Sequence, residues 1–533
     1  MIALLCLALQ AASAPEEPTL EPSTLHCLGV TWIVRGNANQ NARVDVHWRS
    51  GKGEWQPGPP LFRVERGACR LKLADDATLF AGSILDLQPD TPYELRLTLV
   101  DPDGGGVAKI LQTRTIAEPV APKDLVEVHV RPPGKIPVRD AAPGTLLLIH
   151  AGTYEGTLDL SRSGEPGRPI VLRAAGDGEV ILDGKGASNA VVAANLHDVW
   201  FEGLSIRNAL KALTLSNSSR IVVRRCRFSA VTFGVVSTVN EKGDVHGLFI
   251  SDNVFEGPCT WPRTKGIEAA RAVQLTGEGH IVCYNRIRGF ADAVDTMPSA
   301  RCAAIDIHNN EISEMTDDGI EMDYSDRNTR CFRNRLTNVF QGISTQPVHG
   351  GPVYLYRNVL YNVVREPFKL HNSPSGVLLY HNTVVKKGVP FFLSTTDAVH
   401  RVVSRNNLFI GSADAYVIQN EAPMVDCDFD VDGFAGGPSK LFMKWGGERF
   451  ATLEEVRAKA PAYRRLVWLE AAGVDLPEDE KRAAAVGFDA RLKLGIDAGE
   501  VLPGFNDGFS GTAPDLGAIE AGGELPHYGP RQQ

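Results

Sequence analysis

One short pattern recurs through the middle of the chain: a strand of alternating apolar and polar residues, then Asn, then an apolar residue. From Asn285 onward it returns after 25, 24, 24, 24 and 25 residues. A period near 24 residues with period-two alternation predicts a coil of parallel strands in which each turn stacks on the last. We expect the asparagines to hydrogen-bond from turn to turn inside a bend. They are Asn253, Asn285, Asn310, Asn334, Asn358, Asn382 and Asn407, with Cys226 at the same place in an earlier turn.

The repeat defines the predicted fold class, an all-β protein whose main body is a right-handed parallel β-helix over residues 143–410. The stretch from Pro143, PGTLLLIHAGTYEG, resembles the opening of many secreted polysaccharide-degrading β-helices. Residues 411–533 break the pattern and include an expected helix near Leu453 to Ala472. We expect this region to cap the coil, because exposed strand edges must be covered.

The N-terminal part has a different organisation. Residues 1–14 form an apolar run that ends in Ala12-Ser13-Ala14, which is typical of a cleaved signal peptide and predicts a secreted, periplasmic or cell-surface protein. Residues 20–118 contain short alternating strands. The segment LQPDTPYELR around Tyr93 resembles the tyrosine corner of a fibronectin type III domain, which implies a β-sandwich of spacer or binding type. Residues 119–142 are the expected linker and entry to the coil.

Charge and cysteine content narrow the possible partners. The chain of 533 residues has a formal net charge of −9 and shows no basic stretch, so we expect no nucleic-acid partner. No segment after residue 14 has the ~20 apolar residues of a membrane span, and we expect a monomer. Eight cysteines would remain after signal cleavage. In an oxidising compartment this even number permits disulfides, for instance Cys27 with Cys69 or Cys283 with Cys302.

Aligning the turns on their asparagines also aligns the following strand. Val294, Ile320, Ile343 and Phe368 form an apolar column that we expect to point inward. Because side chains alternate along a strand, the next position points outward, and so does the position two residues later. The first outward column is Asp295, Glu321, Ser344, Lys369 and Phe392, and the second is Met297, Asp323, Gln346, His371 and Ser394.

Carboxylates gather on two adjacent turns of this outward face. Like charges this close raise each other's pKa unless a cation neutralises them, and a hard ion that takes oxygen ligands, such as Ca²⁺, would do so. We therefore predict a calcium site, with Lys369 about 10 Å away by the strand spacing. An ordinary solvated acidic patch is the alternative. The candidate ligands are Asp292, Asp295, Asp317, Asp318, Glu321 and Asp323.

Two strand motifs on this face resemble polysaccharide lyase family 9, the calcium-dependent pectate lyases. They are Asp317-Asp318-Gly319-Ile320-Glu321 and Pro367-Phe368-Lys369-Leu370-His371. The resemblance implies that the acids bind Ca²⁺ and that Lys369 is the base in β-elimination on a uronate polymer. Glu321 stands where the family has Asp, His371 stands where it has Gly, and a full turn separates the acids from Lys369.

The lyase interpretation gives roles to further residues. His371, two residues from Lys369, is expected to orient the substrate or to serve as an alternative base. Arg333, Arg365 and Gln346 are candidates for contacts with the saccharide.

Two other functions stay open. A glycoside hydrolase could use two carboxylates on adjacent turns, but of the polygalacturonase motifs only an Asp-Asp is present. A non-catalytic glycan-binding protein would have no need of an amine that faces acids.

Alternating acids from Asp426 to Asp432 suggest a calcium loop, although the solvent-exposed face of a strand has the same pattern.

Overall fold

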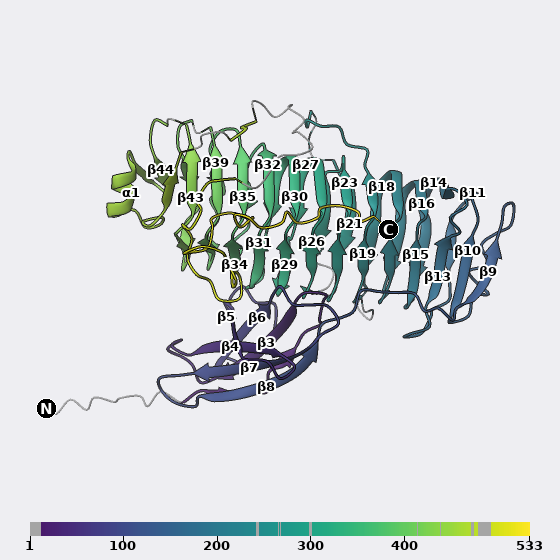
Figure 1. Ribbon diagram of the computed structural model, residues 1–533, viewed down its shortest axis with the longest axis horizontal. Helices are drawn as coiled ribbons and strands as arrows, with labels where there is room; N and C mark the ends of the chain where they lie inside the picture. Colours follow the sequence, from purple (N-terminus) through teal and green to yellow (C-terminus); the bar gives the residue numbers. More distant parts are fainter. Residues whose placement is uncertain are drawn as a thin grey trace.

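The computed structural model describes residues 12–240, 243, 245–264, 266, 268–297, 301–412, 414–437, 439–470, 474–477 and 492–532. Most of the predicted signal peptide therefore lies outside the described residues. The described chain forms an N-terminal antiparallel sheet region and a long parallel β-solenoid, and the ribbon shows the two packed side by side (Figure 1). The prediction of an all-β protein built on a parallel coil is confirmed.

The N-terminal region is an eight-stranded antiparallel arrangement in the order β1-β3-β6-β5-β4-β7-β8, with β2 paired to β3. The Tyr93 hydroxyl accepts a hydrogen bond from the backbone N–H of Gln88, five positions upstream, at 2.9 Å. The strands are β1 (Ala14–Pro15), β2 (Thr19–Leu20), β3 (Leu28–Arg35), β4 (Arg43–Ser50), β5 (Gln56–Arg63), β6 (Ala77–Ile84), β7 (Pro92–Val100) and β8 (Val107–Arg114).

One wall of the solenoid is a 13-stranded parallel sheet, which begins earlier than residue 143 and extends past residue 410. Its strands are β9 (Val126–Val130), β10 (Thr145–Ile149), β13 (Ile170–Ala174), β15 (Val199–Glu202), β17 (Val222–Arg224), β19 (Phe249–Ser251), β22 (Ile281–Cys283), β26 (Asp306–His308), β29 (Thr329–Phe332), β31 (Val353–Tyr356), β34 (Val377–Tyr380), β38 (Val403–Arg405) and β42 (Asp428–Phe429).

A 17-stranded sheet forms a second wall of the solenoid and carries the candidate site. Its strands are β11 (Gly152–Glu155), β12 (Leu158–Leu160), β14 (Val180–Ala194), β16 (Ser205–Ser216), β18 (Arg227–Thr238), β20 (Val254–Glu256), β21 (Arg271–Leu275), β23 (Arg286–Arg288), β24 (Asp292–Thr296), β27 (Glu311–Glu321), β30 (Arg335–Ser344), β32 (Val359–Val363), β33 (Phe368–Lys369), β35 (Thr383–Lys386), β39 (Leu408–Gly411), β43 (Gly433–Gly436) and β46 (Val467–Leu469).

Shorter strands complete the turns. β25 (Cys302–Ala303) pairs with β28 (Ser325–Arg327), and β37 (Val399–His400) pairs with β41 (Met424–Val425). A four-stranded sheet joins β36 (Phe391–Leu393), β40 (Ile418–Asn420), β44 (Met443–Trp445) and β45 (Glu448–Phe450). No helix among the described residues is long and apolar enough to cross a membrane.

The asparagine ladder forms as predicted at the bend between the two sheets. The side-chain amide of Asn310 donates to Oδ1 of Asn334 at 2.9 Å, and Asn334 donates to Asn358 at 3.0 Å. The ladder ends on Asp432, whose Oδ1 accepts from the Asn407 amide at 2.9 Å. Asp432 is fully buried in this role, so the structure places it inside the wall rather than in a calcium loop.

The N-terminal region docks on the solenoid through buried polar contacts. Arg330 and Asp306 form an ion pair with both side chains fully buried, and a guanidinium N–H of Arg330 donates to Ser83 Oγ at 3.1 Å. The Tyr354 hydroxyl accepts from the backbone N–H of Ser83 at 2.9 Å. Polar groups buried in this way need each other as partners, so the region is a fixed part of the molecule.

Two predictions about the C-terminal region and the cysteines need correction. The helix α1 spans only Leu453–Lys459, because Pro461 holds Ala460 in an extended conformation that ends the helix. All eight cysteines among the described residues are free, so the proposed disulfides do not form. Cys283 packs on the outer side of the wall with Leu25, whereas Cys302 lies in the solenoid core.

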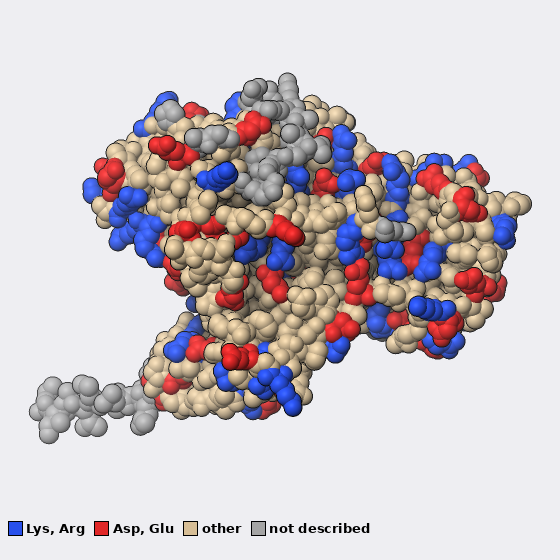
Figure 2. All heavy atoms as spheres, in the orientation of Figure 1, with Lys and Arg blue, Asp and Glu red and all other residues tan. Residues whose placement is uncertain are grey.

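The C-terminal segment 492–532 returns along the solenoid, where Figure 1 shows it as a yellow trace crossing successive turns. Arg531 forms ion pairs with Asp252 of the solenoid and with Glu118 before the first solenoid strand, both at 2.6 Å. On the face shown in Figure 2, positive and negative side chains are interspersed.

Candidate functional site

The strand register confirms the predicted inward column and the first of the two predicted outward columns. Ile320 pairs with Ile343, and Ile343 with Phe368, in the inward column. Asp295 pairs with Glu321, Glu321 with Ser344, and Ser344 with Lys369 in the outward one. The turn-by-turn stacking of β24, β27, β30 and β33 therefore brings residues together that lie up to 74 positions apart in the chain.

Three carboxylates form the centre of the acid cluster. Asp292, Asp317 and Asp318 each offer an oxygen, and these oxygens all lie within 4.8 Å of one another. Asp292 and Asp318 are buried, and Asp317 is partly exposed. The backbone N–H of Asp318 donates to Oδ1 of Asp292 at 3.0 Å, which fixes the two turns relative to each other.

Lys369 reaches this cluster from two turns away. Its Nζ lies 2.8 Å from Oδ2 of Asp318, and its side chain is 13% exposed. Burial lowers the pKa of Lys369, but the carboxylates of Asp318, Asp323 and Asp317 raise it by more. Without a cation at the acids, the amine is therefore held in its charged form.

Two arginines that the sequence reading missed enter the cluster. Arg271 Nε lies 2.7 Å from Oδ2 of Asp295 and 3.4 Å from Oδ2 of Asp292. Arg263 lies 3.3 Å from Asp317 and stacks over Phe340 at 4.0 Å. Arg263 lies in the irregular loop before β21, where the spacing between turns gives no register.

The outer acids of the cluster differ in their contacts. Asp323 Oδ1 accepts from the Ser344 hydroxyl at 2.7 Å and from the backbone N–H of Gln346 at 2.6 Å. Gln346 therefore lies beside the cluster. Asp295 accepts from the Gln274 amide at 2.9 Å.

The cluster contains buried oxygens without a hydrogen-bond donor, and the pKa values of its acids are raised. Oδ1 of Asp318 and Oε2 of Glu321 are buried without a hydrogen-bond partner. Burial raises the pKa of Asp318 to about 7 and that of Asp323 to about 6. Burial and the charges of Asp292 and Asp295 raise the pKa of Glu321 to about 11. Such a donor set fits a hard cation that takes oxygen ligands.

His371 is held by a buried carboxylate that sequence reasoning did not single out. Its Nε2 lies 2.8 Å from Oε2 of Glu366, a residue with no exposed surface. The other oxygen of Glu366 accepts from the backbone N–H of Ser394 at 3.0 Å, and Arg365 contacts the Ser394 hydroxyl at 3.4 Å. Glu366 therefore fixes the orientation of the imidazole beside Lys369.

Arg333 is not brought to the cluster. It lies on the other wall of the solenoid, where it forms an ion pair with Asp86 of the N-terminal region at 3.0 Å. The structure thus gathers the six candidate acids, Lys369, His371, Gln346 and Arg365 on one face, and uses Arg333 in the contact between the two regions.

Comparisons with known proteins give only distant likenesses. No protein-family model matches the chain. The uncharacterized protein YwoF of Bacillus subtilis (strain 168) is 28% identical over 176 residues, which cover 28% of this chain and 35% of that protein.

Two solved structures are also similar. A Paenibacillus alginate lyase is 17% identical, covers 54% of this chain and 90% of its own, and has a TM-score of 0.26. The catalytic domain of a GH87 α-1,3-glucanase in complex with nigerose is 11% identical. The match covers 82% of this chain and 85% of that domain, with a TM-score of 0.25. Likenesses at this level carry no argument about function.

Proposed function

We propose that the protein is a calcium-dependent lyase that cleaves a uronate-containing polysaccharide by β-elimination. The observation that carries the proposal is the meeting of one amine, Lys369 Nζ, with a buried acid cluster at 2.8 Å on an outward face of the solenoid. A protein that only binds glycans has no evident use for an amine directed at buried acids.

The acids would hold the ion. Asp292, Asp317 and Asp318 supply converging oxygens, and the unpartnered oxygens of Asp318 and Glu321 are further ligands. When bound, Ca²⁺ supplies positive charge beside the sugar carboxylate, where negative charge develops as the neighbouring proton leaves.

Lys369 would accept that proton. This role requires Asp318 to release the amine, because the present contact keeps it charged. His371, two residues along the same strand and fixed by Glu366, would contact the sugar next to the cleaved bond. Arg365 and Gln346 lie on the same face and would bind the neighbouring units of the polymer.

We also propose that the protein is secreted, periplasmic or attached to the cell surface, which the leader pattern of residues 1–14 supports. We also propose that the N-terminal region is a fibronectin type III-like domain, which its Tyr93 hydrogen bond supports.

Hydrolysis is the second candidate, favoured by one property of the cluster. Burial raises the pKa of Asp318 to about 7, which is the behaviour of a general acid in glycoside hydrolases. A second carboxylate this close to it would then act as the nucleophile.

A screen against uronate polymers separates these functions. We expect ultraviolet absorbance from the new double bond to rise with calcium and not with chelator. Lys369→Ala should lower turnover by about 10²–10⁴-fold, whereas Lys387→Ala, which removes an exposed lysine of a nearby turn, should not. New reducing ends without a rise in absorbance would instead establish hydrolysis. If neither new reducing ends nor a rise in absorbance is seen, a glycan-binding protein is the better account.

A further inference from the structure

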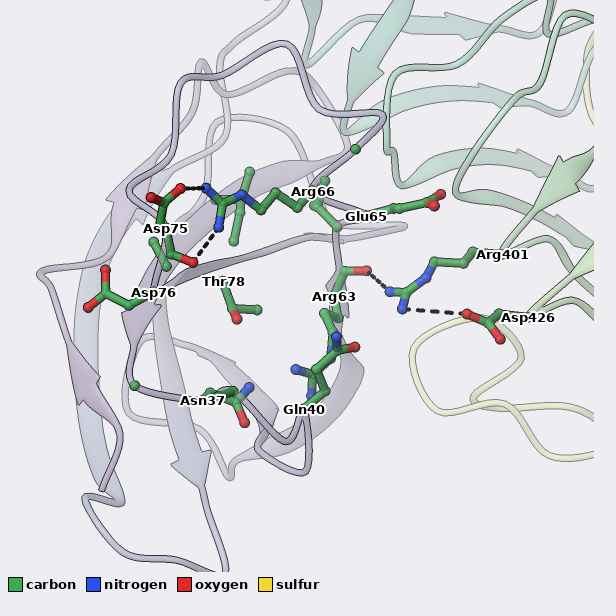
Figure 3. A pocket seen from close by; sticks show the side chains of 16 residues that line it. Asn37, Gln40, Arg63, Glu65, Arg66, Asp75, Asp76, Thr78, Arg401 and Asp426 are labelled. Atoms are coloured by element: carbon green, nitrogen blue, oxygen red, sulfur yellow. Dashed lines mark hydrogen bonds and ion pairs between the residues drawn. The ribbon is translucent and has the colours of Figure 1, made fainter. Parts of the chain in front are cut away.

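A cavity of about 460 Å³ lies between the N-terminal region and the solenoid (Figure 3), and none of its lining residues belongs to the acid cluster. One wall comes from the N-terminal region: the loop 36–40, the end of β5 with residues 63–67, and the start of β6. Arg401, after β37, and Asp426, after β41, form the other wall. Its volume is in the range of small-molecule sites.

Two buried donors that line this cavity have no partner among the described residues. Asn37 is 3% exposed; its Oδ1 accepts from the backbone N–H of Ala42 at 3.2 Å, but its Nδ2 donates to nothing. Arg63 donates through Nη2 to the carbonyl of Ala42, and its guanidinium lies over the Phe80 ring at 5.0 Å, but its buried Nη1 has no hydrogen-bond partner. Buried polar groups are nearly always paired, so two unpaired donors at one cavity indicate a missing acceptor.

A second cation enters from the solenoid. Figure 3 shows Arg401 reaching toward Arg63, and its Nη1 donates to the Arg63 carbonyl at 2.9 Å. Its nearest carboxylate is Asp426 at 3.8 Å, which is 70% exposed. Burial and the charge of Arg401 lower the pKa of Arg63, so the two guanidinium groups act on each other without a buried counter-ion between them.

The remaining acids of the cavity are committed elsewhere. Asp75 pairs with Arg66 at 2.6 Å, and Asp76 pairs with Arg35 at 3.1 Å. Glu65 accepts from the Ser375 hydroxyl at 2.6 Å and lies 3.2 Å from His400. The lining therefore includes two guanidinium groups, of Arg63 and Arg401, and the amide of Asn37, which are complementary to an oxyanion.

We propose that this cavity binds a small oxyanion-bearing ligand, and that the ligand is the carboxylate of a uronic acid unit. The oxyanion follows from Asn37, Arg63 and Arg401, whereas the choice of a uronic acid rests on the proposed function. Since the walls belong to both regions of the molecule, the bound sugar links them and forms a second saccharide site outside the acid cluster.

Calorimetric titration of the full chain with glucuronate or galacturonate tests the proposal, in chelator so that no metal contributes at the acid cluster. Binding should weaken at least tenfold in Asn37→Asp, which keeps the shape and the Ala42 hydrogen bond but replaces the donor with a negative charge. Arg401→Met should have the same effect. Asp318→Asn, in the acid cluster, should leave binding unchanged.

Three results would overturn the inference: no heat with either uronate, binding that survives both cavity variants, or binding lost in Asp318→Asn. Sulfate that binds as tightly as the uronates, or glucose that does so, would overturn the assignment to a sugar acid. Turnover is measured separately, so a failed lyase assay does not decide this titration.

Discussion

The solenoid buries two columns of polar side chains, which differ in whether their polar atoms have hydrogen-bond partners. In the asparagine ladder each amide meets the next, as Asn310 meets Asn334 and Asn334 meets Asn358. In the acid cluster Asp318 and Glu321 keep buried oxygens without partners, and their pKa values are raised. Both columns come from the same stacking of turns.

The difference separates structure from function within one fold. A fully paired buried column stabilises the chain, and nothing further can bind to it. A column of like charges costs folding free energy, which a bound cation can offset. A buried polar column with unmet partners is therefore the part of a solenoid in which to look for a site.

The largest expected effect is on the ladder. Asn334→Ala leaves the Asn310 backbone N–H and side-chain amide without the oxygen that both now contact. Two unpaired buried donors should lower the free energy of unfolding by about 4 kcal/mol in urea denaturation. Asn41→Ala, at an exposed asparagine, is the control and should change it by less than about 0.5 kcal/mol. Equal effects would mean that the ladder adds no stability.

The second effect is on how the free energy of unfolding depends on pH, with opposite signs at His308 and at Asp318. Burial lowers the pKa of His308 to about 4, below the ordinary value near 6.5, so the unfolded chain takes up its proton first. The contribution of neutral His308 to the free energy of unfolding is about 3 kcal/mol. It is complete above pH 6.5 and is lost as the pH falls to about 4.

Asp318 behaves in the reverse way. Its raised pKa means that the folded metal-free protein takes up a proton as the pH falls below about 7, which stabilises it. Unfolding of the wild type, His308→Gln and Asp318→Asn across this range should show slope changes of opposite sign. Slopes that change in the same direction would contradict the comparison.

The smallest effect is on metal-free stability at the cluster. Glu321, with a pKa raised to about 11, is already uncharged at neutral pH, so Glu321→Gln should alter the free energy of unfolding in chelator by less than about 1 kcal/mol. Calcium at a hundred times its Kd should stabilise the wild type by about 2.7 kcal/mol and the variant by less. Thermal unfolding with and without calcium measures both, and an equal response to calcium would remove Glu321 from the site.

The sequence was sufficient wherever the period of the coil was regular. Asn alignment placed Ile320 against Ile343 and Ser344 against Lys369, because a constant turn length determines the register. It failed for Arg263, which reaches Asp317 from an irregular loop. It also failed for Arg333, whose partner Asp86 lies in another region of the chain. No local sequence pattern predicts either of these two contacts.

The C-terminal segment has a consequence for how the protein unfolds. Coils whose turns contact only their neighbours can unravel from either end, one turn after another. Here Arg531 joins Asp252 and Glu118, which lie 279 and 413 positions away. This clasp, together with the docked N-terminal region, makes distant turns depend on one another. The chain should therefore melt in a single transition, and folding should be slow, since its contacts close very long loops.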